Sequence, residues 1–213
     1  MKTHQSGYTL VELSVVVALA GMIVLGSIAG TTTLLHQQRL NELSAQNADA
    51  IKRINETYAQ LPSYAGLSLR QAVSFGAFNQ FTITERATDD VTVTHPFGGA
   101  VGVAPARGDA PLAWGLYLNA IPAAHCIDLL YQAAPMADGL VVFPNGMDAP
   151  NNWTANIAVD INIPAINIAT GLSGPAPRIA KNLTEDLAPA ALVAACSEAG
   201  NTLGVLLLKS KLP

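Results

Sequence analysis

A single carboxylate stands at the entrance to a long apolar stretch near the start of the 213-residue chain. Glu12 is followed by residues 13–38, which contain no Asp, Glu, Lys or Arg. At a helix N-terminus this charge is favoured by the helix dipole, which is one simple interpretation of it. At membrane depth the same group costs about 2.5 to 3.5 kcal/mol unless a cation pairs with it. The sequence places no such cation between Lys2 and Arg39.

Cleavage of the chain could create the missing cation. If the bond between Gly7 and Tyr8 were cut, the new amine of Tyr8 would lie four residues from Glu12. A neighbouring copy could then present its own amine to this carboxylate. The spacing therefore links a candidate processing site to a candidate assembly residue.

Cys126 and Cys196 are the only cysteines of the chain. An even number in a segment that we expect to be exported favours one disulfide over two free thiols. Such a link would close a loop of about 70 residues and contribute about 4 kcal/mol in the chain-entropy model. A metal site is less favoured, because His125 is the only adjacent ligand and no CxxC or HxxxH spacing exists.

The histidines do not form a convincing catalytic group. His36 falls on the predicted long helix, His95 in a predicted turn, and His125 near Cys126 and Asp128 at helical positions that point to different sides. We therefore expect no catalytic residue and no cofactor. A membrane-anchored periplasmic enzyme remains the remote alternative.

The composition indicates that part of the chain does not face water. Charged residues make up 12%, about half the usual share, while apolar residues reach 50% and the mean hydropathy is +0.33. The formal net charge is −4, and no basic run exceeds the pair Lys52 and Arg53. This excludes nucleic-acid binding through a basic patch.

The apolar stretch predicts a membrane helix, because about 20 residues cross the hydrocarbon core. Lys2 before it places the N-terminus in the cytoplasm and the remainder outside. A cleaved secretory signal is the alternative, with small residues at 18–20 or 27–29 as cleavage sites. Glu12 and the continuation of the helix argue against that alternative.

Helical periodicity continues beyond the apolar stretch, and Pro62 is expected to stop it. The apolar positions recur every three or four residues, with charged residues between them. We expect an assembly helix over 8–35 and an amphipathic continuation over 36–61. The predicted buried face consists of Leu40, Leu43, Asn47, Ala50, Ile51, Ile54, Tyr58 and Leu61.

Residues 62–213 predict a globular head. Alternating apolar residues indicate strands near 81–83, 91–93, 101–103, 114–118, 140–143, 157–163 and 203–207, and residues 95–99 have turn composition. Two short helices should begin near Pro122 and Pro189, each carrying one cysteine. The expected fold class is α+β, with the long N-terminal helix packed on an antiparallel β-sheet with short helices and a disulfide-bounded C-terminal region.

Residues 7–12 (GYTLVE) and the apolar run after them resemble the N-terminal motif of the type IV prepilins and related pseudopilins. The motif combines a short basic leader, a glycine, an apolar or aromatic first mature residue, a glutamate and a long apolar helix. In that family a membrane peptidase cuts after the glycine and methylates the new amine. The resemblance implies a leader over 1–7, modification at Gly7 and Tyr8, and pairing of Glu12 with a neighbouring subunit's N-terminus.

Within the family, the cysteine-bounded region is most similar to type IVb pilins of toxin-coregulated, bundle-forming and conjugative thin pili. Residues 121–130, 183–208 and 94–101 are similar to the family's cysteine-bearing helix, terminal segment and glycine-containing turn. The leader is shorter than is usual for type IVb, and Tyr8 is closer to the aromatic start of type IVa. Both departures bear on the subclass.

The resemblance implies a structural subunit of an extracellular pilus. Its precursor would span the inner membrane once, with the head in the periplasm. The implied partners are identical subunits, the prepilin peptidase and methyltransferase, the inner-membrane assembly platform and, before assembly, the lipid bilayer. A minor pilin or a type II secretion pseudopilin is the alternative, and adhesion, aggregation, conjugation and DNA uptake are all compatible with such a filament.

Overall fold

The computed structural model describes residues 9–87, 90–107, 111–147, 150, 153–160, 165–169, 175–197 and 200–211, with the side chains of 25–30, 85–87 and 90 left out. The chain divides into two compact units, Met1–Arg39 and Leu40–Pro213, and each is described by itself. Helix α1 (Leu10–Tyr58) contributes to both units.

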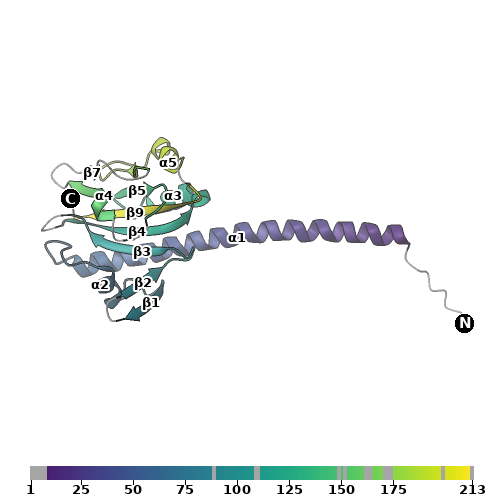
Figure 1. The fold of residues 1–213 in the computed structure, drawn as a ribbon, viewed down its shortest axis with the longest axis horizontal. Helices are drawn as coiled ribbons and strands as arrows, with labels where there is room; N and C mark the ends of the chain where they lie inside the picture. Colours follow the sequence, from purple (N-terminus) through teal and green to yellow (C-terminus); the bar gives the residue numbers. More distant parts are fainter. Residues whose placement is uncertain are drawn as a thin grey trace, which may run out of the picture. The chain divides into compact units, whose positions relative to one another are not determined.

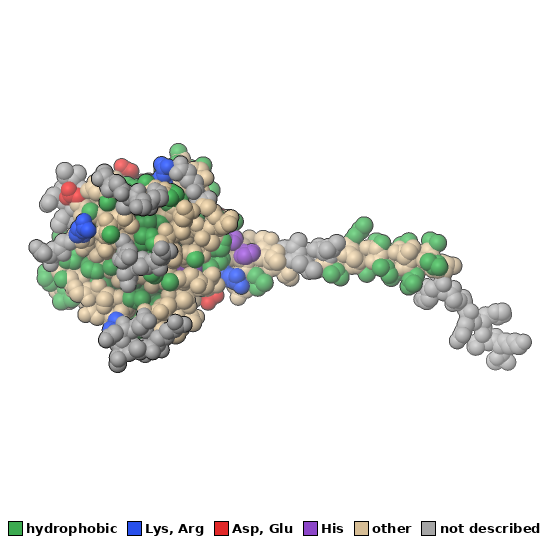
Figure 2. All heavy atoms as spheres, in the orientation of Figure 1, with side chains coloured by type: hydrophobic (Ala, Val, Ile, Leu, Met, Phe, Trp, Pro, Cys, Tyr) green, Lys and Arg blue, Asp and Glu red, His purple; other side chains and the backbone are tan. Residues whose placement is uncertain are grey.

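In the first unit, α1 exposes apolar side chains on every side, and Figure 2 shows those on the face in view. Three consecutive residues, Val15, Val16 and Val17, are 51%, 61% and 64% exposed, so the exposed apolar side chains are not confined to one face of the helix. The other large exposed apolar residues here are Leu10, Val11, Leu13, Leu19, Met22, Ile23, Val24, Leu34 and Leu35. Among the described residues, no helix combines the length and the apolar character needed to cross a membrane.

In the second unit, α1 is amphipathic, as the sequence predicts. Its buried apolar residues are Leu40, Leu43, Ala50, Ile51, Ile54 and Tyr58, and they share one core with the sheet. The predicted position of Leu61 on this face is wrong, because α1 ends at Tyr58 and Leu61 is 48% exposed. The chain leaves the helix in a turn, where Leu61 N–H donates to Tyr58 O.

A seven-stranded antiparallel sheet forms the centre of the head, in the order β1-β2-β3-β4-β9-β5-β8 (Figure 1). The predicted helix-on-sheet fold class is confirmed. The strands are β1 (Thr82–Ala87), β2 (Asp90–Thr94), β3 (Ala100–Pro105), β4 (Ala113–Pro122), β5 (Gly139–Phe143), β8 (Arg178–Lys181) and β9 (Thr202–Ser210). The last strand of the chain, β9, lies between β4 and β5.

Alternate side chains of β9 enter two different cores. Val205 and Leu207 pack with α1, whereas Leu206 and Leu208 pack with Trp153 on the opposite face. That second face is covered by α4 (Trp153–Asn156) and by the separate two-stranded sheet of β6 (Ile157–Asp160) and β7 (Ala165–Ile168). The strand predicted over 157–163 is found as β6 over its described residues, 157–160, where it pairs with β7, and residues 161–163 lie outside the described residues.

The short helices are α2 (Leu69–Ser74), the 3-10 turn η1 (Ala123–His125), α3 (Cys126–Ala133) and α5 (Pro189–Cys196). The predicted start of α5 at Pro189 is confirmed. The helix predicted from near Pro122 is also found: Pro122 ends β4 with extended torsions (φ −61°, ψ 131°), the 3-10 turn η1 follows at Ala123, and α3 continues from Cys126.

The C-terminal segment is bonded to the end of α1 within the second unit. The ammonium of Lys211 donates to the carbonyl oxygens of Tyr58, at 2.5 Å, and of Leu61. It also lies 4.9 Å from the ring centroid of Tyr64. A cation at this place satisfies carbonyls that a helix end leaves free and complements the helix dipole.

Two asparagines of α1 differ in the hydrogen bonding of their side-chain amides. Asn55 Oδ1 accepts hydrogen bonds from Tyr64 Oη and Trp114 Nε1, both at 3.1 Å. Asn47 is 1% exposed, and neither of its amide atoms has a partner among the described residues. A buried polar group without a partner costs free energy, whereas a bonded one connects α1 to the head.

Asn47→Leu and Asn55→Leu should therefore have opposite effects. We expect Asn47→Leu to raise the free energy of unfolding by up to about 1 kcal/mol, because an unpaired amide is removed from the core. Asn55→Leu should lower it by about 2 to 3 kcal/mol, because Trp114 and Tyr64 lose their acceptor. Denaturant unfolding of the detergent-solubilised chain measures both, and equal effects of the two substitutions would contradict this assignment.

Candidate functional site

The start of α1 is closed by hydrogen bonds between Thr9 and Glu12. The backbone N–H and the hydroxyl of Thr9 both donate to Glu12 Oε2, at 3.1 Å each. In return, Glu12 N–H donates to Thr9 Oγ1 at 3.3 Å, and Leu13 N–H donates to Thr9 O at 3.2 Å. Thr9 is thus the N-cap of α1 and Glu12 the third helical residue, which together form a capping box.

Glu12 is exposed and is the acidic residue of the first turn, which agrees with the favourable effect of the helix dipole. Its carboxylate oxygen Oε1 accepts no hydrogen bond from the part of the chain that the structure describes. The predicted processing residues Gly7 and Tyr8 lie outside the described residues. Sequence reasoning missed the capping box, although its T-x-x-E pattern is present in residues 9–12.

The two cysteines are joined, as the sequence predicts. Cys126 and Cys196 form a disulfide with a Cα–Cα distance of 5.9 Å and a sequence separation of 70. It connects the first residue of α3 to the last residue of α5. The bond therefore closes the loop that contains β5, β6, β7 and β8.

Of the described histidines, His95 and His125 both lie against the ring of Phe97. The His125 ring lies against Phe97, with 5.5 Å between ring centroids. His95, which the sequence placed in a turn, is buried there. Its Nδ1 accepts from Phe97 N–H at 3.2 Å, and its Nε2 lies 2.6 Å from Asn119 O. Because a carbonyl only accepts, Nε2 carries the hydrogen and donates it.

The turn at His95 depends on close backbone packing. Gly98 adopts a positive φ of 83°. A Cβ at Gly99 would stand 1.9 Å from Asn119 O, so only glycine fits. Burial lowers the pKa of His95, against the smaller opposing effect of its hydrogen bond to Asn119 O.

Asn119 also holds the turn that follows β5. Its Oδ1 accepts from Tyr117 Oη and from Met147 N–H, both at 3.2 Å, and its Nδ2 donates to Met147 O at 2.7 Å. The next residue, Ala120, has a φ of 52° at the irregular step between Leu118 and Ile121 in the pairing of β4 with β9. Asn119 therefore links two loops to the centre of the sheet, which is a structural role.

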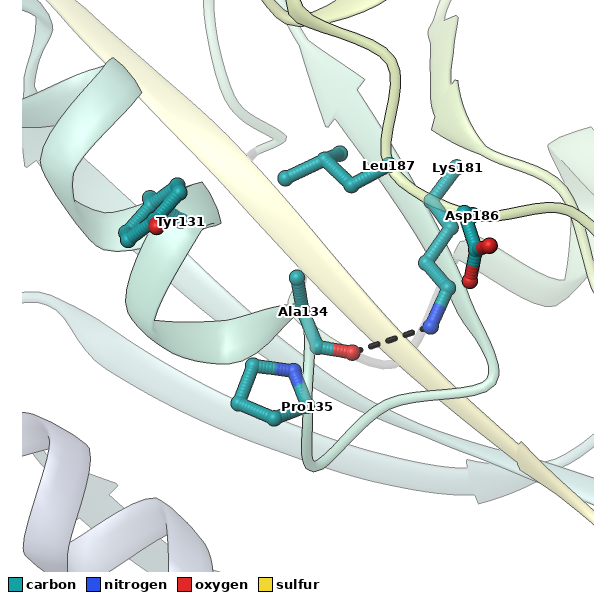
Figure 3. A pocket seen from close by; sticks show the side chains of 6 residues that line it. All are labelled: Tyr131, Ala134, Pro135, Lys181, Asp186 and Leu187. Atoms are coloured by element: carbon teal, nitrogen blue, oxygen red, sulfur yellow. Dashed lines mark hydrogen bonds between the residues drawn. The ribbon is translucent and has the colours of Figure 1, made fainter.

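A pocket of about 470 Å³ lies between the end of α3 and the segment from β8 to α5 (Figure 3). Its lining residues are Tyr131, Ala134, Pro135, Lys181, Asp186 and Leu187. Lys181 Nζ donates to Ala134 O at 2.9 Å and to Ala137 O at 2.8 Å. The lysine thus caps the carbonyl end of α3. Across the described ranges, no three His, Cys, Asp or Glu side chains are grouped as metal ligands would be.

Comparisons with known proteins agree with both the start of the chain and the head. Residues 2–28 match the prokaryotic N-terminal methylation motif. The chain is 24% identical, over 206 residues, to the major structural subunit of the bundle-forming pilus of Escherichia coli O111:H-, covering 94% of this chain and 92% of that protein. The corresponding subunit of Escherichia coli O127:H6 matches with the same identity and coverage.

The crystal structure of TcpA, a type IV pilin from Vibrio cholerae El Tor, superimposes with a TM-score of 0.54. The match covers 81% of this chain and 99% of TcpA at 16% identity. The chain has a type IV pilin fold. The resemblance inferred from residues 7–12 is thereby confirmed, because the motif and the pilin fold were found independently.

The buried His95 should make the stability of the head depend on pH. Because the folded-state pKa is lowered, the unfolded chain binds the proton first as pH falls below about 6.5. The free energy of unfolding should then decrease toward acidic pH, by at most about 1.4 kcal/mol per pH unit.

Denaturant unfolding at about pH 7.5 and at about pH 5.5 tests this expectation. His95→Gln should flatten the dependence, since Gln can still donate to Asn119 O but does not titrate in this range. Ser74→Ala, which removes an exposed hydroxyl of α2 that does not titrate in this range, is the control and should keep the wild-type slope. An unchanged slope in His95→Gln would exclude His95 as the cause.

Proposed function

We propose that the chain is a structural subunit of a type IV pilus of the IVb kind, polymerised through the first part of α1. The observation that carries this proposal is the all-round exposure of apolar side chains on that segment, from Leu10 to Val24 and at Leu34 and Leu35. A helix that is apolar on every face needs an apolar surrounding on every face. A bundle of like helices supplies it, and the match to pilus subunits supports that choice.

Processing would come first. Residues 1–7 act as a leader, a prepilin peptidase cuts the bond between Gly7 and Tyr8, and the new amine of Tyr8 is methylated. The methylation-motif match over residues 2–28 includes this bond and supports the proposal. Cleavage removes Lys2 and leaves an ammonium as the first charge of the mature chain.

Assembly would follow at the inner membrane. The precursor crosses the bilayer once through residues 8–35, with the head in the periplasm, and contacts the peptidase and the assembly platform. The helix then exchanges lipid for neighbouring subunits, and the pair between Glu12 and a neighbour's Tyr8 amine offsets the cost of moving the carboxylate into apolar surroundings. The product is an extracellular filament of identical subunits.

The head suits exposure outside the cell. Its disulfide, Cys126–Cys196, is stable in an oxidising environment, and the central strands β4, β9 and β5 of its sheet are covered on both faces. Adhesion, aggregation and conjugative transfer all fit such a filament. Relatives named as major structural subunits, aligned over nearly their whole length, favour this role over that of a minor pilin or a secretion pseudopilin.

Gly7→Ala should block processing. We expect full-length precursor on a gel and no surface filaments, because the peptidase requires the glycine at the end of the leader. N-terminal sequencing and mass spectrometry of sheared filaments from the wild type should find Tyr8 as the first residue, methylated at its nitrogen. Complete processing and normal filaments in Gly7→Ala would contradict the assignment of residues 1–7 as a leader.

Glu12→Ala should separate cleavage from assembly. The variant retains Gly7 and Tyr8 and should be cut, but filament counts by electron microscopy should fall by at least about tenfold, because the ammonium loses its partner. Glu56→Ala, which removes an exposed carboxylate 3.8 Å from Lys52 on the same helix, is the matched control and should assemble normally. Normal filament counts in Glu12→Ala would refute the pairing role.

A further inference from the structure

The pocket between α3 and the segment from β8 to α5 combines an aromatic wall with charged groups (Figure 3). Tyr131, on α3, has a 73% exposed side chain and lies across the pocket from Lys181 and Asp186. Apolar surface from Ala134, Pro135 and Leu187 completes the lining. The volume of about 470 Å³ falls in the range of about 300 to 1,000 Å³ that small-molecule sites occupy.

The polar groups of this pocket retain unused hydrogen-bonding capacity. Lys181 Nζ donates to Ala134 O and to Ala137 O, so two of its three hydrogens are used. Among the residues that the structure describes, none donates to the Asp186 carboxylate and none bonds to the Tyr131 hydroxyl. The pocket therefore offers a carboxylate with two open oxygens, one ammonium hydrogen and one open hydroxyl.

The charges of the lining disfavour charged ligands. Lys181 and Asp186 give the lining one positive and one negative group, and no ion pair joins these two described residues. Two backbone carbonyls hold the ammonium in place, so a cationic ligand would meet a fixed charge of the same sign. An anionic ligand would meet the carboxylate in the same way. A ligand without charge avoids both costs.

Hydroxyl groups match what the pocket leaves open. A hydroxyl both donates and accepts, so two neighbouring hydroxyls can donate to the oxygens of Asp186 while another oxygen accepts from Lys181. The exposed ring of Tyr131 adds a flat apolar surface beside these groups. A pyranose sugar has both features, because its hydroxyls lie around the edge of its ring and its C–H groups form an apolar face.

We propose that this pocket binds a neutral hexopyranose, with the ring of Tyr131 against the C–H face of the sugar and Asp186 accepting hydrogen bonds from two adjacent hydroxyls. Lys181 donates its remaining hydrogen to a sugar oxygen. The inference goes beyond the proposed function, because the site lies within the head of one chain and needs no second subunit.

Covalent and polar links hold the walls of the pocket in place. The disulfide joins the first residue of α3, Cys126, to the last residue of α5, Cys196. The two bonds of Lys181 connect the end of β8 to the backbone that follows α3. A preformed site loses less conformational entropy on binding than a site that must first be ordered. A single sugar ring should therefore bind measurably.

The test measures the binding of single sugars to the detergent-solubilised chain. A polyoxyethylene detergent is used, because detergents with sugar headgroups would compete for the site. The probes are the methyl glycosides of glucose, galactose, mannose and N-acetylglucosamine, and saturation-transfer NMR titrations give the Kd of each. We expect at least one glycoside to bind at millimolar concentration, with the strongest transfer to C–H protons on one face of the sugar.

Variants of the two walls should each weaken binding. Tyr131→Ala should raise Kd about tenfold, whereas Tyr131→Phe, which keeps the ring, should stay within about twofold of the wild type. Asp186→Asn should raise Kd about tenfold, because the sugar hydroxyls lose a charged acceptor.

Two exposed residues that do not line the pocket provide matched controls. Ile127→Ala removes an apolar side chain one turn before Tyr131 on α3, and Glu185→Gln removes the charge next to Asp186 in the chain. Both variants should bind like the wild type. Because Tyr131 and Asp186 are exposed, their substitution should leave the head folded, which circular dichroism checks.

The proposal is overturned if none of the glycosides binds, or if either Tyr131→Ala or Asp186→Asn binds like the wild type. Binding of a free amino acid, whose opposite charges match Lys181 and Asp186, in place of the glycosides would also overturn it. The assay uses the unassembled chain, so its failure is distinct from missing cleavage or missing filaments, which would contradict the pilus assignment.

Discussion

Strand β9 is buried on both faces from Leu203 to Leu208, and the rest of the head is arranged around it. Its hydrogen bonds reach β4 on one side and β5 on the other. Its alternate side chains complete the core under α1 and the core under β6 and β7. Beyond it, Lys211 bonds to the end of α1. Burial of this apolar strand thus joins the two halves of the sheet and both layers that cover it.

The first part of α1 is governed by the opposite condition. Its apolar side chains are exposed on all faces, and the capping box of Thr9 and Glu12 is the described polar arrangement that closes its start. The same carboxylate that begins the helix is the group that the proposed assembly mechanism uses. A helix cap tolerates this double use because one carboxylate has two oxygens and several acceptor positions.

Apolar periodicity and the position of proline predicted the elements whose formation depends on residues close together in the sequence. The long helix, the alternation through β2 and β3, and the start of α5 at Pro189 were all found as expected. Short elements such as β8 and α2 were missed, because four to six residues with mixed polarity carry little periodic signal. β7 was missed because the strand predicted before it was expected to end at Pro164, and four residues carry little periodic signal.

The candidate site was likewise predictable only where it depends on residue spacing or on the cysteine count. The spacing of residues 7–12 identified the motif, and the cysteine count predicted the disulfide. The bonds from His95 to Asn119 and from Lys211 to Tyr58 could not be predicted, because they join residues 24 and 153 positions apart. Such contacts follow from the order of strands in the sheet, which no local pattern encodes.

The central place of β9 also sets the order in which the head can fold. Both strands that flank it, β4 and β5, precede it in the chain, so each keeps an open edge until β9 has been synthesised and has paired with them. Both cysteines precede β9, which means that the covalent loop can close around an unfinished sheet. Completion of the head therefore depends on the strand that follows all its sheet partners along the chain.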